Sequence, residues 1–457
     1  MTHRRTWWPG CALLLGLLCG GAIAAEPPPA WRAQYLRVDA PRVLLTGVRV
    51  IDGTGAAPVD AQSILIENGV ITAVGPDVQA PEGATVLNLQ GRSVMPGLVM
   101  LHEHMMYFSG SSVWHSQPVS YPKLYLAAGV TTLRTAGTEH PEVDRNLKRR
   151  IDAGIVPGPR MHLTGPYFNG AAGDFLGDTV LASPEEGRAA AAYWAGRGFT
   201  SFKLYDSVGP ELAAAVIDEA HRHGVKVTGH LRALGCAEAA RLGIDSIEHA
   251  FMSCAKELDL APNYAGFVAR LDDAAVRNLI RTLVDEDVVL VSTPIAVDRK
   301  LDEERLAMLA PQARENYLAL AETDASWLPD AQGMKELRKL ERAFVEAGGR
   351  LGVGADAMDL GLIAGYANHD VLALLVDDGW TPLEVIRMAT SNGAELLGVG
   401  DRQGRIAPGY TADLIVMPGD PSVDIGALRH AELVFKDGAG YDPAKLREAA
   451  EGKVGWH

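Results

Sequence analysis

Eight short apolar runs, each followed by a helical pattern, dominate the middle of this 457-residue chain. Runs of this kind, separated by helical segments, are typical of βα units and a parallel sheet. The runs occupy residues 93–101, 130–135, 160–165, 200–205, 225–230, 245–250, 288–294 and 350–357. Eight parallel strands, each followed by a helix, can close into a barrel. The sequence therefore predicts an α/β fold, a (β/α)8 TIM barrel, over residues 94–400.

Shorter alternating runs flank this region on both sides. Between residues 43 and 89, and again over 405–436, apolar and polar residues alternate and are interrupted by Gly, Asp and Pro. Such runs are typical of small strands joined by tight turns. We therefore expect the segments 25–93 and 401–457 to form one small β-sandwich domain beside the barrel. The charged, Ala- and Leu-rich segment 298–337 is longer than an ordinary loop and predicts a helical insertion over the barrel mouth.

The first residues differ from the rest of the chain. Arg4 and Arg5 precede a short apolar run that ends in the small-residue sequence AIA. The run is shorter than the roughly 20 residues that a membrane span needs, so it predicts a secretory signal peptide over residues 1–24. We expect a periplasmic or secreted protein without a stable membrane span. Whether the signal is cleaved or lipidated at Cys19 stays open.

Charge and cysteine content restrict the partners of the mature chain. Loss of the signal leaves 40 Lys and Arg against 57 Asp and Glu, a formal charge of −17. This excess of acid argues against nucleic acid as a partner, so we expect a small-molecule substrate. The sequence leaves a homo-oligomer open. Cys236 and Cys254 remain, and an oxidising compartment permits either a bridge between them or two free, buried thiols.

Polar residues able to bind a metal fall at or near the C-terminal ends of the predicted strands, where barrel enzymes build their active sites. They are His102, His104, Lys203, His230, His249 and Asp356. Each alone would more often be a packing residue or a helix cap, but six of them on five strands predict a metal site. Residues two apart on a strand share a face, so His102 and His104 can grip one ion. Glu103 points to the opposite face, where we expect its charge to pair with a Lys or Arg behind the barrel.

The chain resembles the amidohydrolase superfamily, in the branch with imidazolonepropionase-like and prolidase-like dipeptide hydrolases. The segments that carry the resemblance are VMPGLVMLHEH, GFTSFKLYDS, VKVTGHL, GIDSIEHA, GVGADA and NGAELLGVGDRQGRIAPGYTADLIVMPGDP. The resemblance implies two divalent metal ions, and imidazole and carboxylate ligands favour zinc. It implies that His102, His104 and Asp356 bind one ion and that His230 and His249 bind the other. Between the ions it implies a bridging, carboxylated Lys203.

Two features favour hydrolysis over deamination. Deaminases of this superfamily lack the bridging Lys and usually place a Glu three residues after the fifth-strand His, where this chain has Ala233. The resemblance therefore implies hydrolysis of a C–N bond in a small substrate, such as a dipeptide or an N-acyl amino acid, through a metal-bridging hydroxide. Asp356 would act as the catalytic acid and base as well as a ligand.

Substrate contacts are the least constrained part of this interpretation. Tyr107, Tyr205 and Arg232 each follow a candidate ligand by two or three residues, and Arg232 suits a substrate carboxylate. Packing or surface pairing is the plainer interpretation of each. A lactonase or esterase on the same binuclear site is one alternative, because hydroxide also attacks esters. A catalytically silent periplasmic binding barrel is another, but it predicts a damaged ligand set, and this set is intact.

Overall fold

The computed structural model describes residues 29–110, 114–172, 177–261, 263–294, 301–321 and 330–455. The predicted signal peptide, residues 1–24, lies outside these ranges, as do parts of the predicted insertion. Among the described residues, no helix has both the length and the apolar character needed to cross a membrane.

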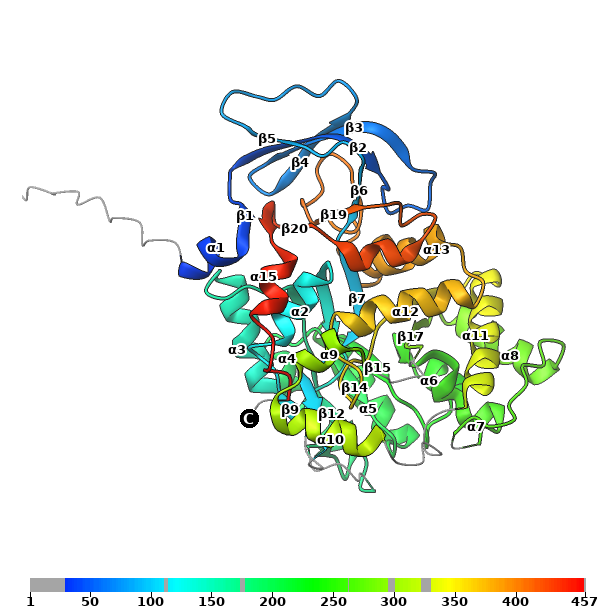
Figure 1. Cartoon of the computed structure of the whole chain (residues 1–457). Helices are drawn as coiled ribbons and strands as arrows, with labels where there is room; N and C mark the ends of the chain where they lie inside the picture. Colours follow the sequence, from blue (N-terminus) through cyan, green and yellow to red (C-terminus); the bar gives the residue numbers. More distant parts are fainter. Residues whose placement is uncertain are drawn as a thin grey trace, which may run out of the picture.

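All eight predicted runs contain a strand of the parallel part of the fold (Figure 1). In chain order these strands are β7 (Leu98–Glu103), β10 (Val130–Thr135), β11 (Arg160–His162) with β12 (Thr164–Asn169), β14 (Ser201–Leu204), β15 (Lys226–Gly229), β16 (Ser246–Glu248), β17 (Val289–Ser292) and β18 (Arg350–Val353). The first of the predicted runs also includes part of β6 (Arg92–Pro96), which belongs to a different sheet.

The parallel strands follow one another in the order of a barrel. β7, β10 and β11 form a three-stranded sheet, and a second sheet runs from β12 through β14 to β18, with the short β13 (Thr179–Val180) beside β12. Leu163 alone separates β11 from β12. At the other end, the N–H of Asp356 donates to the carbonyl of His102 at 3.0 Å and joins the end of β18 to β7. The fold is a TIM-barrel-like α/β fold, although no continuous ladder closes it among the described strands.

Helices lie between the strands and cover them (Figure 1). They are α2 (Tyr121–Ala127), α3 (Pro141–Asp152), α4 (Pro184–Ala195), α5 (Pro210–Arg222), α6 (Cys236–Arg241), α7 (Ala255–Leu258), α8 (Ala274–Asp285), α11 (Ala331–Glu346), α12 (Tyr366–Asp377), α13 (Pro382–Arg387) and α14 (Gly393–Leu396). Neighbouring helices pack closely: at Gly187 in α4, an added Cβ would lie 2.7 Å from a methyl of Leu212 in α5. Because helices cover them, strands such as β14 and β17 are buried along their whole length.

The N- and C-terminal segments share one nine-stranded sheet, as the blue and the orange-red ribbons at one end of Figure 1 show. Its strands are β1 (Leu36–Val38), β2 (Arg42–Val50), β3 (Val59–Glu67), β4 (Val70–Gly75), β5 (Thr85–Asn88), β6, β19 (Leu414–Pro418), β20 (Leu433–Lys436) and β21 (Ala439–Tyr441). β19 pairs antiparallel with β6, which joins the two termini. The predicted partnership of the two segments is therefore present, whereas the arrangement as a sandwich is not confirmed and stays a prediction.

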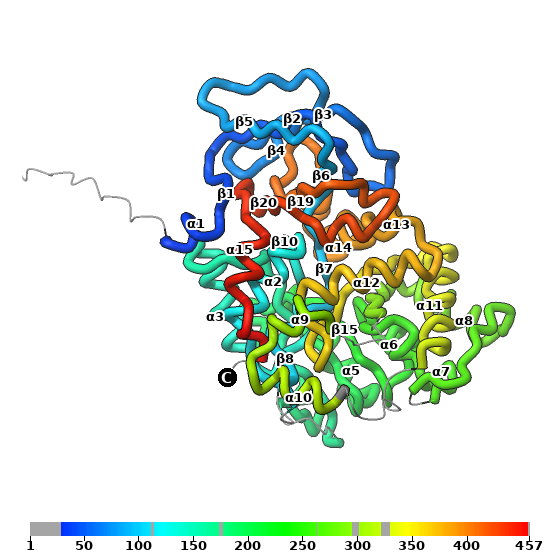
Figure 2. The backbone as a smooth tube through the Cα atoms, in the orientation of Figure 1, coloured from blue at the N-terminus to red at the C-terminus, as the bar shows by residue number. Residues whose placement is uncertain are grey.

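The described part of the segment 298–337 is helical, as predicted. It contains α9 (Glu303–Met308), α10 (Pro311–Ala321) and the start of α11. The C-terminal tail packs on α9, where the N–H of Val454 donates to the carbonyl of Met308 at 2.9 Å (Figure 2). None of the described residues 301–321 lines the main cavity of the barrel, so the predicted position over the mouth is not confirmed.

Candidate metal centre

Two histidines at the end of β7 direct ring nitrogens at one carboxylate. Nε2 of His102 lies 3.3 Å from Oδ1 of Asp356, and Nε2 of His104 lies 3.0 Å from the same oxygen. Nδ1 of His104 is 3.1 Å from the carbonyl of Gly137, and Nδ1 of His102 is 2.6 Å from Oε2 of Glu248. Since both Nδ1 atoms face acceptors, the protons belong there, and each Nε2 presents a lone pair.

Three acceptors thus converge on one point in the protein interior. Nε2 of His102, Nε2 of His104 and Oδ1 of Asp356 are buried, and none of them has a hydrogen-bond partner among the described residues. Lone pairs that face one another at this distance repel unless a cation lies between them. Two imidazole nitrogens and a carboxylate oxygen are ligands that suit zinc, so the residues fit a metal ion.

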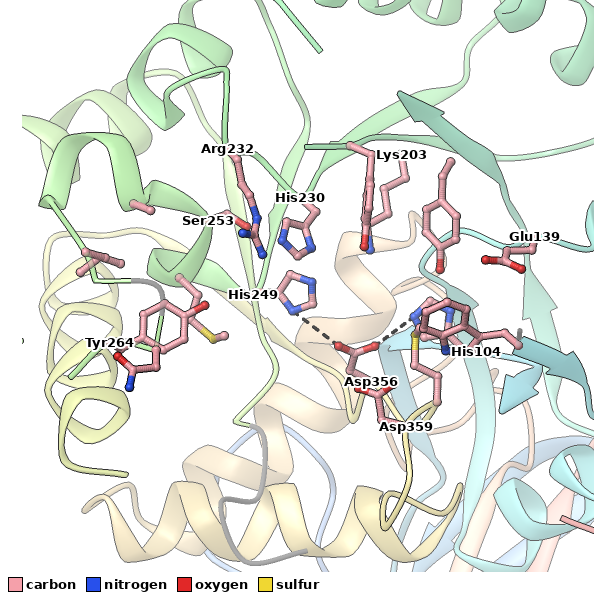
Figure 3. Close-up of a pocket in the computed structure, with 18 of the residues that line it drawn as sticks. His104, Glu139, Lys203, His230, Arg232, His249, Ser253, Tyr264, Asp356 and Asp359 are labelled. Atoms are coloured by element: carbon pink, nitrogen blue, oxygen red, sulfur yellow. Dashed lines mark ion pairs between the residues drawn. The ribbon is translucent and has the colours of Figure 1, made fainter. Parts of the chain in front are cut away.

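His249 and His230 extend this group along the barrel (Figure 3). Nδ1 of His249 lies 3.7 Å from Oδ2 of Asp356, and one ligand atom from each of His102, His249 and Asp356 lies within 4.8 Å of the others. The ring of His230 is 4.6 Å from that of His249, centroid to centroid. The structure therefore brings together the histidines and the aspartate that the sequence singled out. Their roles as ligands stay a prediction.

The backbone bends sharply at two of these residues. His249 follows β16 with φ 59° and Asp356 follows β18 with φ 50°. Residues other than glycine seldom adopt this left-handed conformation, and the strain costs about 1 kcal/mol or more at each position. Such conformations gather at functional sites, because the surrounding fold holds the side chain in a direction that a regular strand would not give.

Lys203 is buried in β14 and lines the same cavity as His230, His249 and Asp356. Its Nζ lies 5.4 Å from the ring centre of Tyr167 and 5.5 Å from that of Tyr205. Burial lowers the pKa of its amine, and Arg134 adds to this effect, while nearby carboxylates oppose it. A larger neutral fraction makes the amine more reactive.

Burial also controls the charge of the other groups. It lowers the pKa of His230 to about 3 and that of His249 well below its usual range, which keeps both rings neutral at pH 7. Burial would raise the pKa of Asp356, but His102 and His104 outweigh it and hold this pKa well below its ordinary value. Neutral imidazoles and an ionised carboxylate are the states that bind metal.

Glu248, which the sequence analysis missed, orients His102. It is fully buried at the end of β16, and besides His102 it accepts hydrogen bonds from Arg134 and from the hydroxyl of Thr228. Arg134, His102 and Lys203 lower the pKa of its carboxyl despite burial. The signal in the sequence was a Glu beside His249 in a strand predicted to be buried, since buried carboxylates need partners.

The contacts of Glu103 differ from those that we expected from the sequence. Its Oε1 accepts from the backbone N–H of Ala355 at 2.9 Å and from the side-chain amide of Asn368 at 2.8 Å. No Lys or Arg of the described residues forms an ion pair with it, so the expected pairing behind the barrel is wrong. Burial raises the pKa of its carboxyl to about 7. Glu103 instead ties β7 to the residue that precedes Asp356.

The cavity beside the histidines has a volume of about 470 Å³. Tyr205 and Arg232 line it, whereas Tyr107 does not; Tyr107 is fully buried, and its ring packs 6.3 Å from that of Tyr121. Nε of Arg232 lies 3.2 Å from Oδ1 of Asp206. The structure thus places two of the three predicted substrate contacts at the cavity.

A disulfide joins Cys236 to Cys254. The sequence had left open whether these cysteines form a bond or stay as free thiols. Cys236 begins α6, six residues after His230, and Cys254 ends a short 3₁₀ helix, Ala250–Cys254, that directly follows His249. Both cysteines are fully buried. The bond therefore links the two loops that leave the strands carrying His230 and His249.

Comparison with known proteins agrees with this architecture. An enamidase from Eubacterium barkeri is 24% identical, over 81% of this chain and 84% of that enzyme. An imidazolonepropionase of Vibrio cholerae serotype O1 is 23% identical, over 82% of this chain and 92% of the relative. A Xaa-Pro dipeptidase structure with bound methionine in its active site has 21% identity and a TM-score of 0.67, covers 88% of this chain and all of its own (100%), and supports the fold alone.

A further solved structure, a Bifidobacterium longum protein provisionally described as a prolidase, is 28% identical with a TM-score of 0.66, over 89% of this chain and 98% of its own. The amidohydrolase family as a whole matches residues 93–442. This match spans most of the chain, so the protein belongs to the amidohydrolase family and is a hydrolase acting on carbon–nitrogen bonds.

Proposed function

We propose that this protein is a metal-dependent amidohydrolase that cleaves the C–N bond of a small amide, a dipeptide or an N-acyl amino acid. The observation that carries the proposal is the convergence of Nε2 of His102, Nε2 of His104 and Oδ1 of Asp356. These buried acceptors line up beside a cavity that also contains Lys203.

The residues divide into two ligand groups. His102, His104 and Asp356 would hold one zinc ion and His230 and His249 a second, with a carboxylated Lys203 between them. The contact between Asp356 and His249 supports a shared site, because it sets ligands of the two groups side by side. When bound, such ions supply hydroxide near neutral pH and polarise the scissile carbonyl.

Asp356 is the proposed acid and base. Its carboxylate is ionised and faces the cavity, so it can accept a proton from the attacking water. It then returns this proton to the leaving nitrogen, which departs as a neutral amine. The hydrogen bond from its own N–H to His102 and the tie from Glu103 to Ala355 hold the carboxylate in place.

The substrate class rests on the cavity and on the relatives. Arg232 lines the cavity and suits a carboxylate, because a guanidinium binds two oxygens in parallel. The relative provisionally described as a prolidase, which is 28% identical, supports a peptide-like substrate. Lactone cleavage at the same site is the alternative.

We also propose a periplasmic or secreted location. The predicted signal peptide and the Cys236–Cys254 bond support it, since disulfides persist in oxidising compartments.

The test combines metal analysis with a substrate panel. Purified protein should contain about two zinc ions per chain by elemental analysis, and it should hydrolyse dipeptides or N-acyl amino acids in preference to lactones. Asp356→Asn should keep the fold, by circular dichroism, but lower turnover roughly 100-fold or more. Protein free of metal after growth with ample zinc, or a preference for lactones, would contradict the proposal.

A further inference from the structure

Glu139 is an acidic side chain at the edge of the cavity. It lies four residues beyond the end of β10, is half-buried and lines the cavity together with Lys203 and Asp356. It forms no hydrogen bond or ion pair with any residue in the ranges that the structure describes. A cation that enters the cavity would stabilise an ionised carboxylate in this position.

The surroundings of Glu139 hold its side chain in place. A Cβ at Gly177 would lie 2.2 Å from Cγ of Glu139, so the chain at Gly177 packs directly against the acidic side chain. Burial raises the pKa of the Glu139 carboxyl, and Asp178 adds to this rise, whereas His140 opposes it. The negative charge is therefore poorly compensated by the protein itself.

Arg232 occupies the opposite side of the cavity. Figure 3 shows Glu139 on one side of Lys203 and Asp356, and Arg232 on the other, beyond His230. The candidate metal ligands lie between these two opposite charges. A substrate whose scissile amide reaches the ligands would therefore place its two ends toward opposite charges.

We infer that Glu139 is a specificity-determining residue that binds a substrate ammonium group, while Arg232 binds the carboxylate at the other end of the same molecule. The inference rests on the proposed function, and it selects dipeptides over N-acyl amino acids as the substrate class. A free dipeptide carries both charges at pH 7, since its α-amino pKa is about 8. An N-acyl amino acid has the same amide and carboxylate but no ammonium, and it leaves Glu139 desolvated without a partner. The substrate class is thus an unblocked dipeptide.

The experiment uses substrate pairs that differ only in the amino group. Ala-Pro, Ala-Phe and Ala-Met are each compared with the matching N-propionyl amino acid, which keeps the scissile amide and the carboxylate. For the wild-type protein, we expect kcat/KM for the dipeptide to exceed that for its partner by about tenfold or more, the scale of one charge-assisted contact. Glu139→Gln should remove this preference by raising KM for the dipeptide, with little change in its kcat or in the propionyl compound.

Two further variants serve as controls. Glu142→Gln removes an exposed acid of α3 that pairs with Arg145, and it should leave the preference unchanged. Glu139→Asp keeps the charge and should retain part of the preference. Circular dichroism and zinc content identify a variant that fails to fold.

Calorimetric binding of both members of each pair separates failure of the inference from failure of the proposed function. Binding that depends on the ammonium and on Glu139, without hydrolysis, would support the inference and contradict the proposed function. Equal kcat/KM for both members of every pair, or an equal loss for both in Glu139→Gln, would overturn the inference while the hydrolase assignment stands. Absence of both binding and hydrolysis for every compound would overturn both.

Discussion

Oε2 of Glu248 lies 2.6 Å from Nδ1 of His102, and both side chains are fully buried. This contact fixes the proton of His102 on Nδ1 and leaves the lone pair of Nε2 directed at Asp356. Glu248 is itself held by Arg134 and Thr228. A carboxylate that accepts the distal ring proton of a metal-binding histidine sets the orientation and the basicity of that ligand. Glu248 is therefore a positioning residue for the candidate metal centre.

Glu248→Gln should weaken metal binding about 10- to 100-fold, the scale for loss of such a partner. The amide keeps the shape of the side chain but removes the charge that favours Nδ1–H on His102. Competition with a chelator measures the zinc affinity directly, and it does not depend on activity. Because Arg134 loses its ionic partner, denaturant unfolding should also show a loss of about 3 kcal/mol or more. A variant with wild-type zinc affinity would remove Glu248 from the positioning role.

Most of the barrel could be predicted from the sequence. Short, mostly apolar strands such as β17 and helices that end at glycine have local signals, and the polar residues near the strand ends then locate the site. The role of Glu248 could not be predicted, because it depends on Arg134 and His102, which lie more than 100 residues away. Alternation along β7 predicts that Glu103 points away from His102 and His104. It could not predict that its partners are the backbone of Ala355 and the side chain of Asn368.

Other features of the molecule depend on distances that only the folded chain provides. Cys236 and Cys254 lie 18 residues apart in sequence, and a spacing of this kind is compatible with free thiols as well as with a bond. Tyr107 follows His104 by three residues, yet its neighbour Met106 lines the cavity and Tyr107 does not. The strands β8 (Met106–Phe108) and β9 (Trp114–Ser116) pair here, and the fully buried ring of Tyr107 packs against that of Tyr121 in α2 instead.

Lys203→Ala should lose at least one metal ion and nearly all turnover. A lysine ammonium has only donors and cannot bind a metal, so a bridging role requires conversion of the neutral amine to a carbamate, which offers two oxygens. A short carboxylic acid such as propionate should partly restore both metal content and activity, because it can fill the vacated space. Lys203→Arg should not substitute, since guanidinium stays charged. Two bound metals and near-normal turnover in Lys203→Ala without added acid would favour a mononuclear site.

Removal of the disulfide should destabilise the fold and loosen the site. Replacement of both Cys236 and Cys254 by Ala removes a bond that closes a short loop, for which the loss is about 3 kcal/mol. Alanine is chosen over serine because both positions are fully buried, and a serine would bury a hydroxyl there. Urea unfolding should show a lower midpoint for the double variant, and reductant should shift the wild type but not the variant. A midpoint unchanged by the double substitution would show that packing alone holds these two loops together.

Glu341 in α11 should make stability depend on pH. It is buried and accepts a hydrogen bond from Ser292 at 2.8 Å, and burial raises its pKa from 4.5 to about 7. A folded-state pKa above the unfolded value means that the stabilising contribution is complete below about pH 4.5 and is lost as the pH rises through 7. Glu341→Gln cannot ionise, so its stability relative to the wild type should be higher at pH 8 than at pH 5 by roughly 1 to 3 kcal/mol. Denaturant unfolding at the two pH values measures this difference, with Glu346→Gln, an exposed position on the same helix, as the control that should show none. If the two variants respond to pH alike, the buried carboxyl of Glu341 does not contribute to the pH dependence of stability.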